Sequence, residues 1–236
     1  MGPENHFLTS LSQADRRALD PGLSLMELER GQVLAEPGQM VAYVWLPQGS
    51  VISIVSLMRD GRAVESRTIG LESGFGLLNA LGSRLSYERV TVQIPGPAWR
   101  ISVDALGAAA RQSPSLVKSI VVHGQATLVQ AAQQTACNAL HGVDARLCRW
   151  LLLTQDRVKA DILPLTQEHL AIMLGVQRTT VTAAALHLQA QGHIAYTRGK
   201  IRVLNRDGLK AGACECYYAT EQAVHQMLGG FSVPAG

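Results

Sequence analysis

The sequence predicts an α+β protein with an N-terminal β-roll, one long helix and a C-terminal helical unit that ends in a hairpin. Three observations carry this prediction. In the first half, short apolar runs alternate with glycine-bearing turns. In the middle, no proline occurs between Pro114 and Pro164, and charge is sparse. Residues 166–202 then read as a helix, a glycine turn, a second helix and a basic hairpin.

Composition sets the broad class. The chain has 236 residues, of which 47% are hydrophobic and 17% charged, enough to build one large or two modest cores and too little charge for a disordered chain. The start lacks a secretory signal, and no run approaches the ~20 apolar residues of a membrane span. We therefore expect a cytoplasmic protein without a membrane partner. Four late cysteines do not form the disulfide framework of a small secreted scaffold.

Residues 1–113 are assigned to the β-roll, with a helical lead-in over residues 1–28. The sequence Ser12-Gln13-Ala14-Asp15 is typical of a helix cap. Apolar runs at 41–46, 51–55, 89–94 and 98–101 predict strands. Their spacing fits a jelly roll or barrel of roughly eight strands.

Residues 114–139 are assigned to one long helix, since Ser113 and Pro114 favour a helix start. Only Lys118 carries a full charge between residues 115 and 138, so this helix should not lie free in water. Spacings of three and four predict a seam for two-fold dimerisation, formed by Val117, Ile120, Gly124, Thr127, Ala131 and Gln134. The alternative is a helix packed wholly within one subunit.

Residues 140–206 are assigned to a winged helix-turn-helix, and residues 207–236 to a C-terminal tail. Thr166 is a good N-cap for the first helix, and Gly175 permits the positive φ that the turn requires. The second helix is expected from about residue 177 to 191, and residues 197–200 form the tight turn of a basic wing. This order of elements predicts binding to double-stranded DNA.

The residue types divide the expected contacts into two sets. Side chains that match base edges are Gln177, Arg178, Thr179 and Thr182. Side chains placed for the sugar-phosphate backbone are Thr166, His169, Thr180, Arg198 and Lys200. Between residues 144 and 206, nine Lys or Arg stand against four acids, and we interpret this local excess as a footprint for phosphates.

On these residues the chain resembles the Crp/Fnr superfamily of bacterial transcription factors (cyclic-AMP receptor and fumarate-nitrate regulator). The match rests on Thr166, Leu170, Leu174, Gly175, Arg178, Thr180, Val181, Leu188, Ile194 and Gly199-Lys200, and in the first half on Gly31, Gly38, Val44 and Gly49. The resemblance implies a homodimer on a pseudo-palindromic operator and RNA polymerase as a partner. Thr179 and Ala183 stand where relatives often have glutamate and arginine, so we expect a different operator.

The same resemblance bears on the effector. The cyclic-nucleotide cassette of the family is degenerate here, because Leu77 replaces its glutamate and the arginine-serine pair is missing. Cyclic AMP is therefore not expected, no cofactor is predicted, and the small-molecule effector is unknown. Residues that would line its pocket are Gly76, Leu77, Leu78, Arg84, Tyr87 and Arg89. Cysteines for an iron-sulfur sensor are missing before Cys137, whereas His6 and His123 leave haem open.

The sequence leaves two further features to interpret. The first is the β-roll, on which a small-ligand carrier or cupin-like enzyme could be built, but residues 29–101 contain no histidine for a metal. We therefore expect no enzyme. The second concerns Cys214 and Cys216, which are either a redox or metal pair or part of a packed tail. Two thiols make half a zinc site, to which His225 is a possible addition, and no metal site is predicted.

Overall fold

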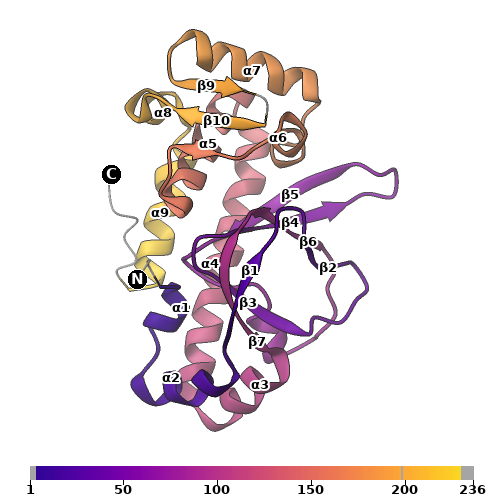
Figure 1. Cartoon of the computed structure of the whole chain (residues 1–236), viewed down its shortest axis with the longest axis vertical. Helices are drawn as coiled ribbons and strands as arrows, with labels where there is room; N and C mark the ends of the chain where they lie inside the picture. Colours follow the sequence, from indigo (N-terminus) through magenta and orange to yellow (C-terminus); the bar gives the residue numbers. More distant parts are fainter. Residues whose placement is uncertain (1–3, 198, 230–236) are drawn as a thin grey trace.

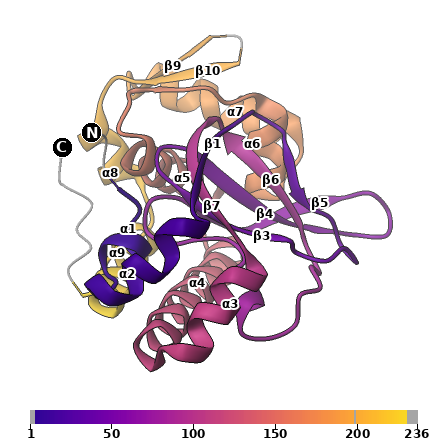
Figure 2. The ribbon, with the colours of Figure 1, turned by 60° about the horizontal axis from the view of Figure 1, so that its bottom comes forward.

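The computed structural model describes residues 4–197 and 199–229. A β-roll packs beside one long helix, and a helical unit with a small sheet lies at one end of that helix (Figure 1). Figure 2 shows helices α3 (Val103–Gln112) and α4 (Pro114–Leu140) side by side next to the roll. In the described part of the chain, no helix combines the length and apolar character that a membrane span requires.

The lead-in is helical only up to residue 22. It contains α1 (His6–Thr9), α2 (Gln13–Leu19) and the short η1 (Asp20–Gly22). The predicted Ser12 cap is confirmed, because the Ser12 hydroxyl accepts a hydrogen bond from the Asp15 backbone amide at 3.1 Å. The expectation of helix up to residue 28 is wrong, since Ser24–Leu28 pairs as a strand with the segment before α3.

The roll is made of two antiparallel sheets. One has the order β1 (Ser24–Leu28), β7 (Gly96–Ser102), β3 (Tyr43–Pro47), and the other β2 (Val33–Ala35), β6 (Arg89–Ile94), β4 (Val51–Leu57), β5 (Ala63–Ile69). The described residues thus hold seven strands of the roll rather than eight, and all four strand runs predicted from the sequence fall on them. The apolar residues of β3, β4 and β6 form the core between the sheets.

Helix α4 begins where predicted. Ser113 caps it, since its hydroxyl accepts the Leu116 amide at 3.2 Å, and Pro114 occupies the first turn. The hydroxyls of Ser113 and Ser115 also donate to the Asp15 carboxylate at 2.5 and 2.7 Å, which joins α2 to the start of α4. These hydrogen bonds lower the pKa of Asp15.

The C-terminal unit starts with α5 (Val143–Val158) and continues through β8 (Ile162–Leu163), α6 (Gln167–Leu174), α7 (Arg178–Ala190), β9 (Ile194–Thr197) and β10 (Lys200–Val203). The segment described from the sequence as a tail forms two helices, α8 (Arg206–Gly212) and α9 (Cys216–Met227). Helix α9 packs along α4 (Figure 1). It therefore belongs to the body of the molecule.

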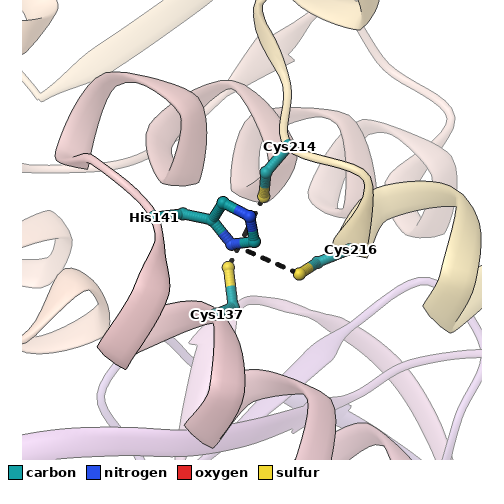
Figure 3. A group of neighbouring side chains, drawn as sticks. All are labelled: Cys137, His141, Cys214 and Cys216. Carbon is teal, nitrogen blue, oxygen red and sulfur yellow. Dashed lines mark hydrogen bonds between the residues drawn. The ribbon is translucent and has the colours of Figure 1, made fainter.

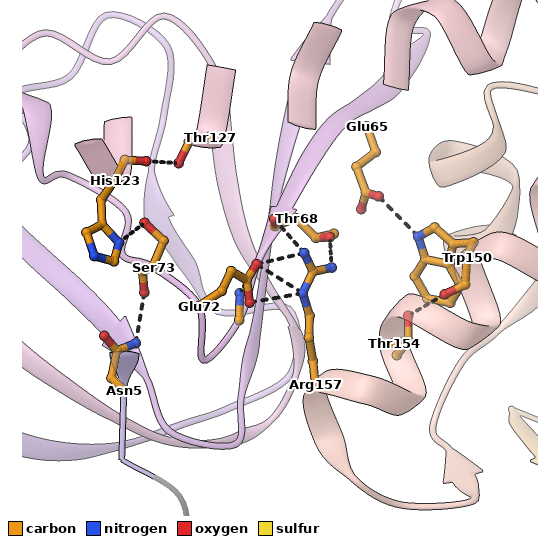
Figure 4. Close-up of polar contacts among 11 residues, drawn as sticks. Asn5, Glu65, Thr68, Glu72, Ser73, His123, Thr127, Trp150, Thr154 and Arg157 are labelled. Atoms are coloured by element: carbon orange, nitrogen blue, oxygen red, sulfur yellow. Dashed lines mark hydrogen bonds and ion pairs between the residues drawn. The ribbon is translucent and has the colours of Figure 1, made fainter. Parts of the chain in front are cut away.

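Buried polar contacts join α5 to the roll (Figure 4). Arg157 forms an ion pair with Glu72 at 2.7 Å, and both side chains are at most 10% exposed. Two helical turns before Arg157, the Trp150 indole N–H donates a hydrogen bond to the Glu65 carboxylate at 3.2 Å. Burial raises the pKa of Glu65, whereas at Glu72 burial is outweighed by Arg157 and the pKa is lowered.

Candidate nucleic-acid interface

The helix-turn-helix is built from local signals that act as predicted. The Thr166 hydroxyl accepts the His169 amide at 3.2 Å and caps α6. Gly175 ends α6 in the left-handed conformation, with φ of 61°, a value that most side chains avoid. Leu170 and Leu174 of α6 pack against Val181 of α7 in a buried core.

Helix α7 presents one polar end to solvent. Gln177 is its N-cap residue, and Gln177, Arg178, Thr179 and Thr180 are all exposed. Thr182 is half-buried, and its hydroxyl donates to the Arg178 carbonyl at 2.9 Å. Helix α7 lies at one end of the molecule (Figure 1), and the exposure of these residues shows that no described part of the chain covers them.

The two residues expected to contact phosphate from α6 are engaged with each other. The Thr166 hydroxyl and the His169 Nδ1 atom lie 2.5 Å apart, and both residues are half-buried. Burial, followed by the charge of Arg30, lowers the pKa of His169, so the ring is neutral at pH 7. His169 is thus a hydrogen-bonding group and not a cation at this surface.

The wing is a three-stranded antiparallel sheet of order β8–β10–β9. Lys200 and Arg202 project from β10 and are exposed, whereas Ile201 between them is buried. Gly199 has φ of 76°, which the tight turn requires. Arg198, the other wing residue predicted to meet phosphate, lies outside the described residues.

The basic footprint is smaller than the sequence count indicated. Arg146 and Arg149 are buried at 7% and 3% exposure, Arg157 pairs with Glu72, and Arg206 pairs with Asp156 at 2.6 Å. Interpreting these four as phosphate contacts is therefore wrong, because two are buried and the other two are paired with carboxylates inside the fold. The described cations left at the surface of this unit are Lys159, Arg178, Lys200 and Arg202.

Sequence reasoning missed one exposed group on α7. Leu186 is 59% exposed and lies two turns beyond Thr179 on the same side of the helix. An apolar side chain there suits contact with a thymine methyl or a partner surface. The helical spacing from Thr179 and Thr182 is the signal that would have identified it.

A pocket of about 260 Å³ lies between the roll and α4. Gly76 and Leu78 line it from the roll, together with Arg67, and Thr127 and Ala131 line it from α4. Arg67 is already paired with Glu88 at 2.9 Å, so its charge is compensated. Most of the remaining lining is apolar, including Ile54, Ile69, Phe75 and Leu128.

Of the six residues predicted to line an effector pocket, only Gly76 and Leu78 do so. Leu77 is buried in the roll core, and Tyr87 is 76% exposed away from the pocket. Arg84 pairs with Asp104, and Arg89 with Glu36 at 2.9 Å. The prediction is wrong for these four, because acids hold Arg84 and Arg89, the core holds Leu77, and Tyr87 is exposed to solvent.

The face of α4 that was predicted to form a dimer seam is largely covered within the chain. Ile120 is fully buried in the roll core and Gln134 is 8% exposed, so neither can meet a second chain. Gly124 faces the roll, because a Cβ atom there would lie 2.7 Å from Leu78. Val117, Thr127 and Ala131 are half-buried on the flank of the helix.

The exposed face of α4 is formed by the residues that directly follow those of the predicted seam. Its members alternate by three and four over the whole helix, and all are exposed: Lys118, Val121, Gln125, Leu128, Ala132, Thr135 and Ala139. Leu128 is 69% exposed and Val121 39%. The spacing of three and four residues agrees with the prediction from the sequence. The predicted choice of the exposed face is wrong.

Comparison with known proteins agrees with this architecture. Residues 145–211 match the family described as the Crp-like helix-turn-helix domain. The chain has the Crp/Fnr regulator fold and carries a Crp-like helix-turn-helix domain. Among curated proteins, none matches the sequence.

Three solved structures illustrate the likeness to Crp/Fnr regulators. A putative Crp/Fnr regulator from Eubacterium rectale superposes with a TM-score of 0.70 at 16% identity, covering 89% of this chain and 99% of its own. FixK2 from Bradyrhizobium japonicum has a TM-score of 0.69 at 17% identity, covering 81% of this chain and 98% of its own. The Crp/Fnr regulator TTHA1359 from Thermus thermophilus has a TM-score of 0.65 at 20% identity, covering 80% of this chain and 98% of its own. The prediction of a Crp/Fnr-type fold is confirmed.

Proposed function

We propose that this chain is a DNA-binding transcriptional regulator that acts as a homodimer on a pseudo-palindromic operator. The observation that carries the proposal is the free polar end of α7, next to a wing with two exposed cations, inside a Crp-like helix-turn-helix domain. A helix of this kind fits the major groove, where base edges are distinguishable.

Base reading is assigned to the start of α7. The Arg178 guanidinium is exposed, and the hydrogen bond that holds it among the described residues is a 3.3 Å bond to Gln167, so it can turn to a guanine edge. Gln177, Thr179 and Thr182 offer contacts to adenine and to thymine methyl groups. Backbone contacts come from Thr180 and Lys200, with Thr166 and His169 as hydrogen-bonding partners.

Dimerisation is assigned to the exposed stripe of α4. A repeat of three and four residues is the spacing with which two helices pack along a common seam. The small residues Ala132 and Ala139 allow close approach, and Val121 and Leu128 supply apolar contact. A two-fold axis along this seam would place the two α7 helices for half-sites about one helical turn of DNA apart. RNA polymerase is the further partner that a regulator of this type implies.

The pocket beside α4 is assigned to a small effector other than a cyclic nucleotide. A bound phosphodiester needs a cation, and the one arginine of this pocket is neutralised by Glu88. The apolar lining favours an uncharged, largely apolar ligand. Because Thr127, Leu128 and Ala131 line the pocket from α4, such a ligand would act directly on the helix that carries the dimer seam.

The test is selection of sites from a random DNA pool with the purified full-length protein, followed by titration of the selected site against salt. We expect a two-fold symmetric consensus, and an affinity that falls steeply as salt rises, because binding releases counterions. The matched control is His187→Ala, since His187 is exposed on the far half of α7 and bonded to Asp144. It should select the same consensus as the unaltered protein.

A Gln177→Ala, Arg178→Ala double variant should lose the consensus and retain salt-dependent binding. The proposal fails if the unaltered dimer enriches no symmetric site, or if the double variant selects the same consensus. A monomer that binds single half-sites would retain the DNA-binding proposal and refute the homodimer.

A further inference from the structure

Four potential metal ligands meet at the junction between the long helix and the C-terminal unit (Figure 3). Cys137 comes from the last turn of α4, and His141 follows that helix directly. Cys214 lies between α8 and α9, and Cys216 begins α9. The three cysteines are at most 6% exposed, and all are free thiols.

The spacing of the ligand atoms suits a tetrahedral metal ion. All four lie within 4.8 Å of one another. The sulfurs of Cys137 and Cys214 are 3.5 Å apart, as are the Cys216 sulfur and His141 Nδ1. Zinc bond lengths imply separations of about 3.8 Å between two sulfur ligands and about 3.6 Å between sulfur and nitrogen. A cluster of several irons would need its ligands further apart.

The surroundings of the four residues also fit ligation. The Glu215 carboxylate lies 3.5 Å from His141 Nε2, whereas the other ring nitrogen, Nδ1, contacts the Cys216 sulfur. Metal-bound histidines commonly donate their second ring N–H to a carboxylate, which orients the ring. The Gln133 side-chain amide donates to the Cys216 sulfur at 3.0 Å, as outer-shell groups do to metal-bound ligands.

Two buried arginines near the site carry positive charge that can balance a negatively charged metal centre. Arg146 and Arg149 are 7% and 3% exposed, and in the described part of the chain neither forms an ion pair with a carboxylate. Arg149 donates a hydrogen bond to the Gln134 side chain, which lies on α4 one turn before Cys137. Zinc with three thiolates and one neutral imidazole carries a net charge of −1, which a buried arginine would balance.

We propose that Cys137, His141, Cys214 and Cys216 bind one zinc ion, or another thiophilic divalent ion of tetrahedral preference, as a closed structural site. This proposal replaces the expectation of no metal site drawn from the sequence, where Cys214 and Cys216 alone made half a site. His225, considered as a third ligand, is not a member of the cluster. The fold supplies Cys137 and His141 instead.

The position of the site gives the ion a mechanical role. It would tie the end of α4 and the α4–α5 connection to the segment that joins α8 to α9. These elements set the angle between the long helix and the DNA-binding unit. A four-ligand site leaves no open position, so it would stabilise this junction and carry out no catalysis.

The test uses full-length protein purified under reducing conditions. Metal content by mass spectrometry should give one zinc per chain. After removal of zinc with a chelator, titration with Co²⁺ should saturate at one equivalent, with thiolate-to-cobalt charge-transfer bands and the intense visible bands of a tetrahedral site. This measurement needs no variant and does not depend on DNA binding.

Variants then assign the ligands. Cys216→Ala and His141→Ala should weaken zinc binding by more than about 100-fold in competition with a chelator, since loss of an outer-shell partner alone typically costs 10–100-fold. The matched control is Cys148→Ala. Cys148 is the one cysteine of the sequence that lies outside the cluster, and it is equally buried. It should bind one equivalent with unchanged bands.

Several results would overturn the site. One is reduced wild-type protein that takes up no Co²⁺, or takes it up without charge-transfer bands. Another is a cluster variant that binds metal as tightly as Cys148→Ala. A third is a Cys137–Cys214 disulfide whose reduction restores no metal binding.

Discussion

At the scale of single residues, His123 shows how burial turns an ordinary side chain into a source of pH dependence. Its ring lies against Phe7 with centroids 5.2 Å apart, and its Nδ1 atom is 3.3 Å from the Ser73 hydroxyl. Burial, and then the charge of His6, lowers the pKa of His123 to about 4, while Glu72 acts in the opposite direction. This arrangement makes the neutral ring part of the core and leaves no exposed ring for haem ligation.

We predict that stability falls as the pH drops from about 6.5 to about 4. The unfolded chain takes up a proton on His123 near pH 6.5 and the folded chain only near pH 4, so acid favours unfolding in this window. The shift corresponds to about 3 kcal/mol of unfolding free energy. Urea unfolding between pH 4 and 7 measures it.

The control is His123→Gln, which keeps a hydrogen-bonding group for Ser73 and does not titrate. Glu65, whose raised pKa makes stability fall as pH rises, is present in both proteins, so the difference between the two curves isolates His123. Equal pH dependence in both proteins would contradict the assignment.

The proposed DNA contacts also divide at the level of single side chains. We predict that Arg178→Ala lowers the ratio of operator to random-DNA affinity by about 10–100-fold, the range of one lost bidentate base contact. Lys200→Ala should weaken binding to both DNAs alike and reduce the salt dependence by about one ion per subunit. Fluorescence anisotropy with selected and scrambled duplexes separates the two effects, and an unchanged ratio for Arg178→Ala would remove its role in reading bases.

At the scale of elements, α4 combines three surfaces on one helix. Leu116 and Ile120 pack into the roll, Ala126 packs against α9, and the stripe around Leu128 remains exposed. A mostly uncharged exposed stripe is unusual for a helix that faces water. Its heptad-like spacing is the physical argument for a second copy of the chain.

We predict that Leu128→Glu converts the proposed homodimer to a monomer. A two-fold axis along the stripe brings each Leu128 near its copy, so the substitution would set two like charges against each other in place of apolar contact. Sedimentation velocity measures the state of assembly. Leu25→Glu is the control, because Leu25 is a 53% exposed apolar residue on β1 away from α4, and it should remain dimeric. Dimeric Leu128→Glu would refute the seam.

For the whole molecule, the contacts of α5 hold the C-terminal helical unit against the roll. Arg157 lies across Gly70, where a Cβ atom would come within 2.6 Å of its side chain, and it pairs with the buried Glu72. Val64 of β5 likewise approaches Gly175, the turn of the helix-turn-helix, at 3.1 Å from where a Cβ atom would stand. The orientation of the two units is therefore specified by contacts between side chains far apart in sequence.

We predict that Arg157→Met destabilises the protein by about 3–5 kcal/mol at pH 7, because it leaves a buried carboxylate without its cation. The double variant Arg157→Met, Glu72→Gln should recover much of this loss, since no buried charge remains. Denaturant unfolding of the two variants tests the ion pair. Losses of equal size in both would mean that packing, and not charge, is what Arg157 contributes.

The sequence by itself determined the order of the elements and the place of the helix-turn-helix. Caps such as Ser113 and Thr166, the turn at Gly175 and the 3.6-residue period act over a few neighbours, so they can be recognised without the fold. The residues at the start of α7 followed from the same signals, and their roles in DNA binding stay predictions.

Only the tertiary structure decided which side of each element faces outward and which distant residues meet. A helical period is the same for a seam and for a core face, so the packing of the roll and α9 against α4 had to select the exposed stripe. Likewise, a count of basic residues cannot tell that Arg157 faces Glu72 inside the fold. Cys137 and Cys214 are 77 residues apart, and no local signal joins them until α9 folds back along α4. Contacts over such separations depend on the packing of the whole chain, which no short window of sequence contains.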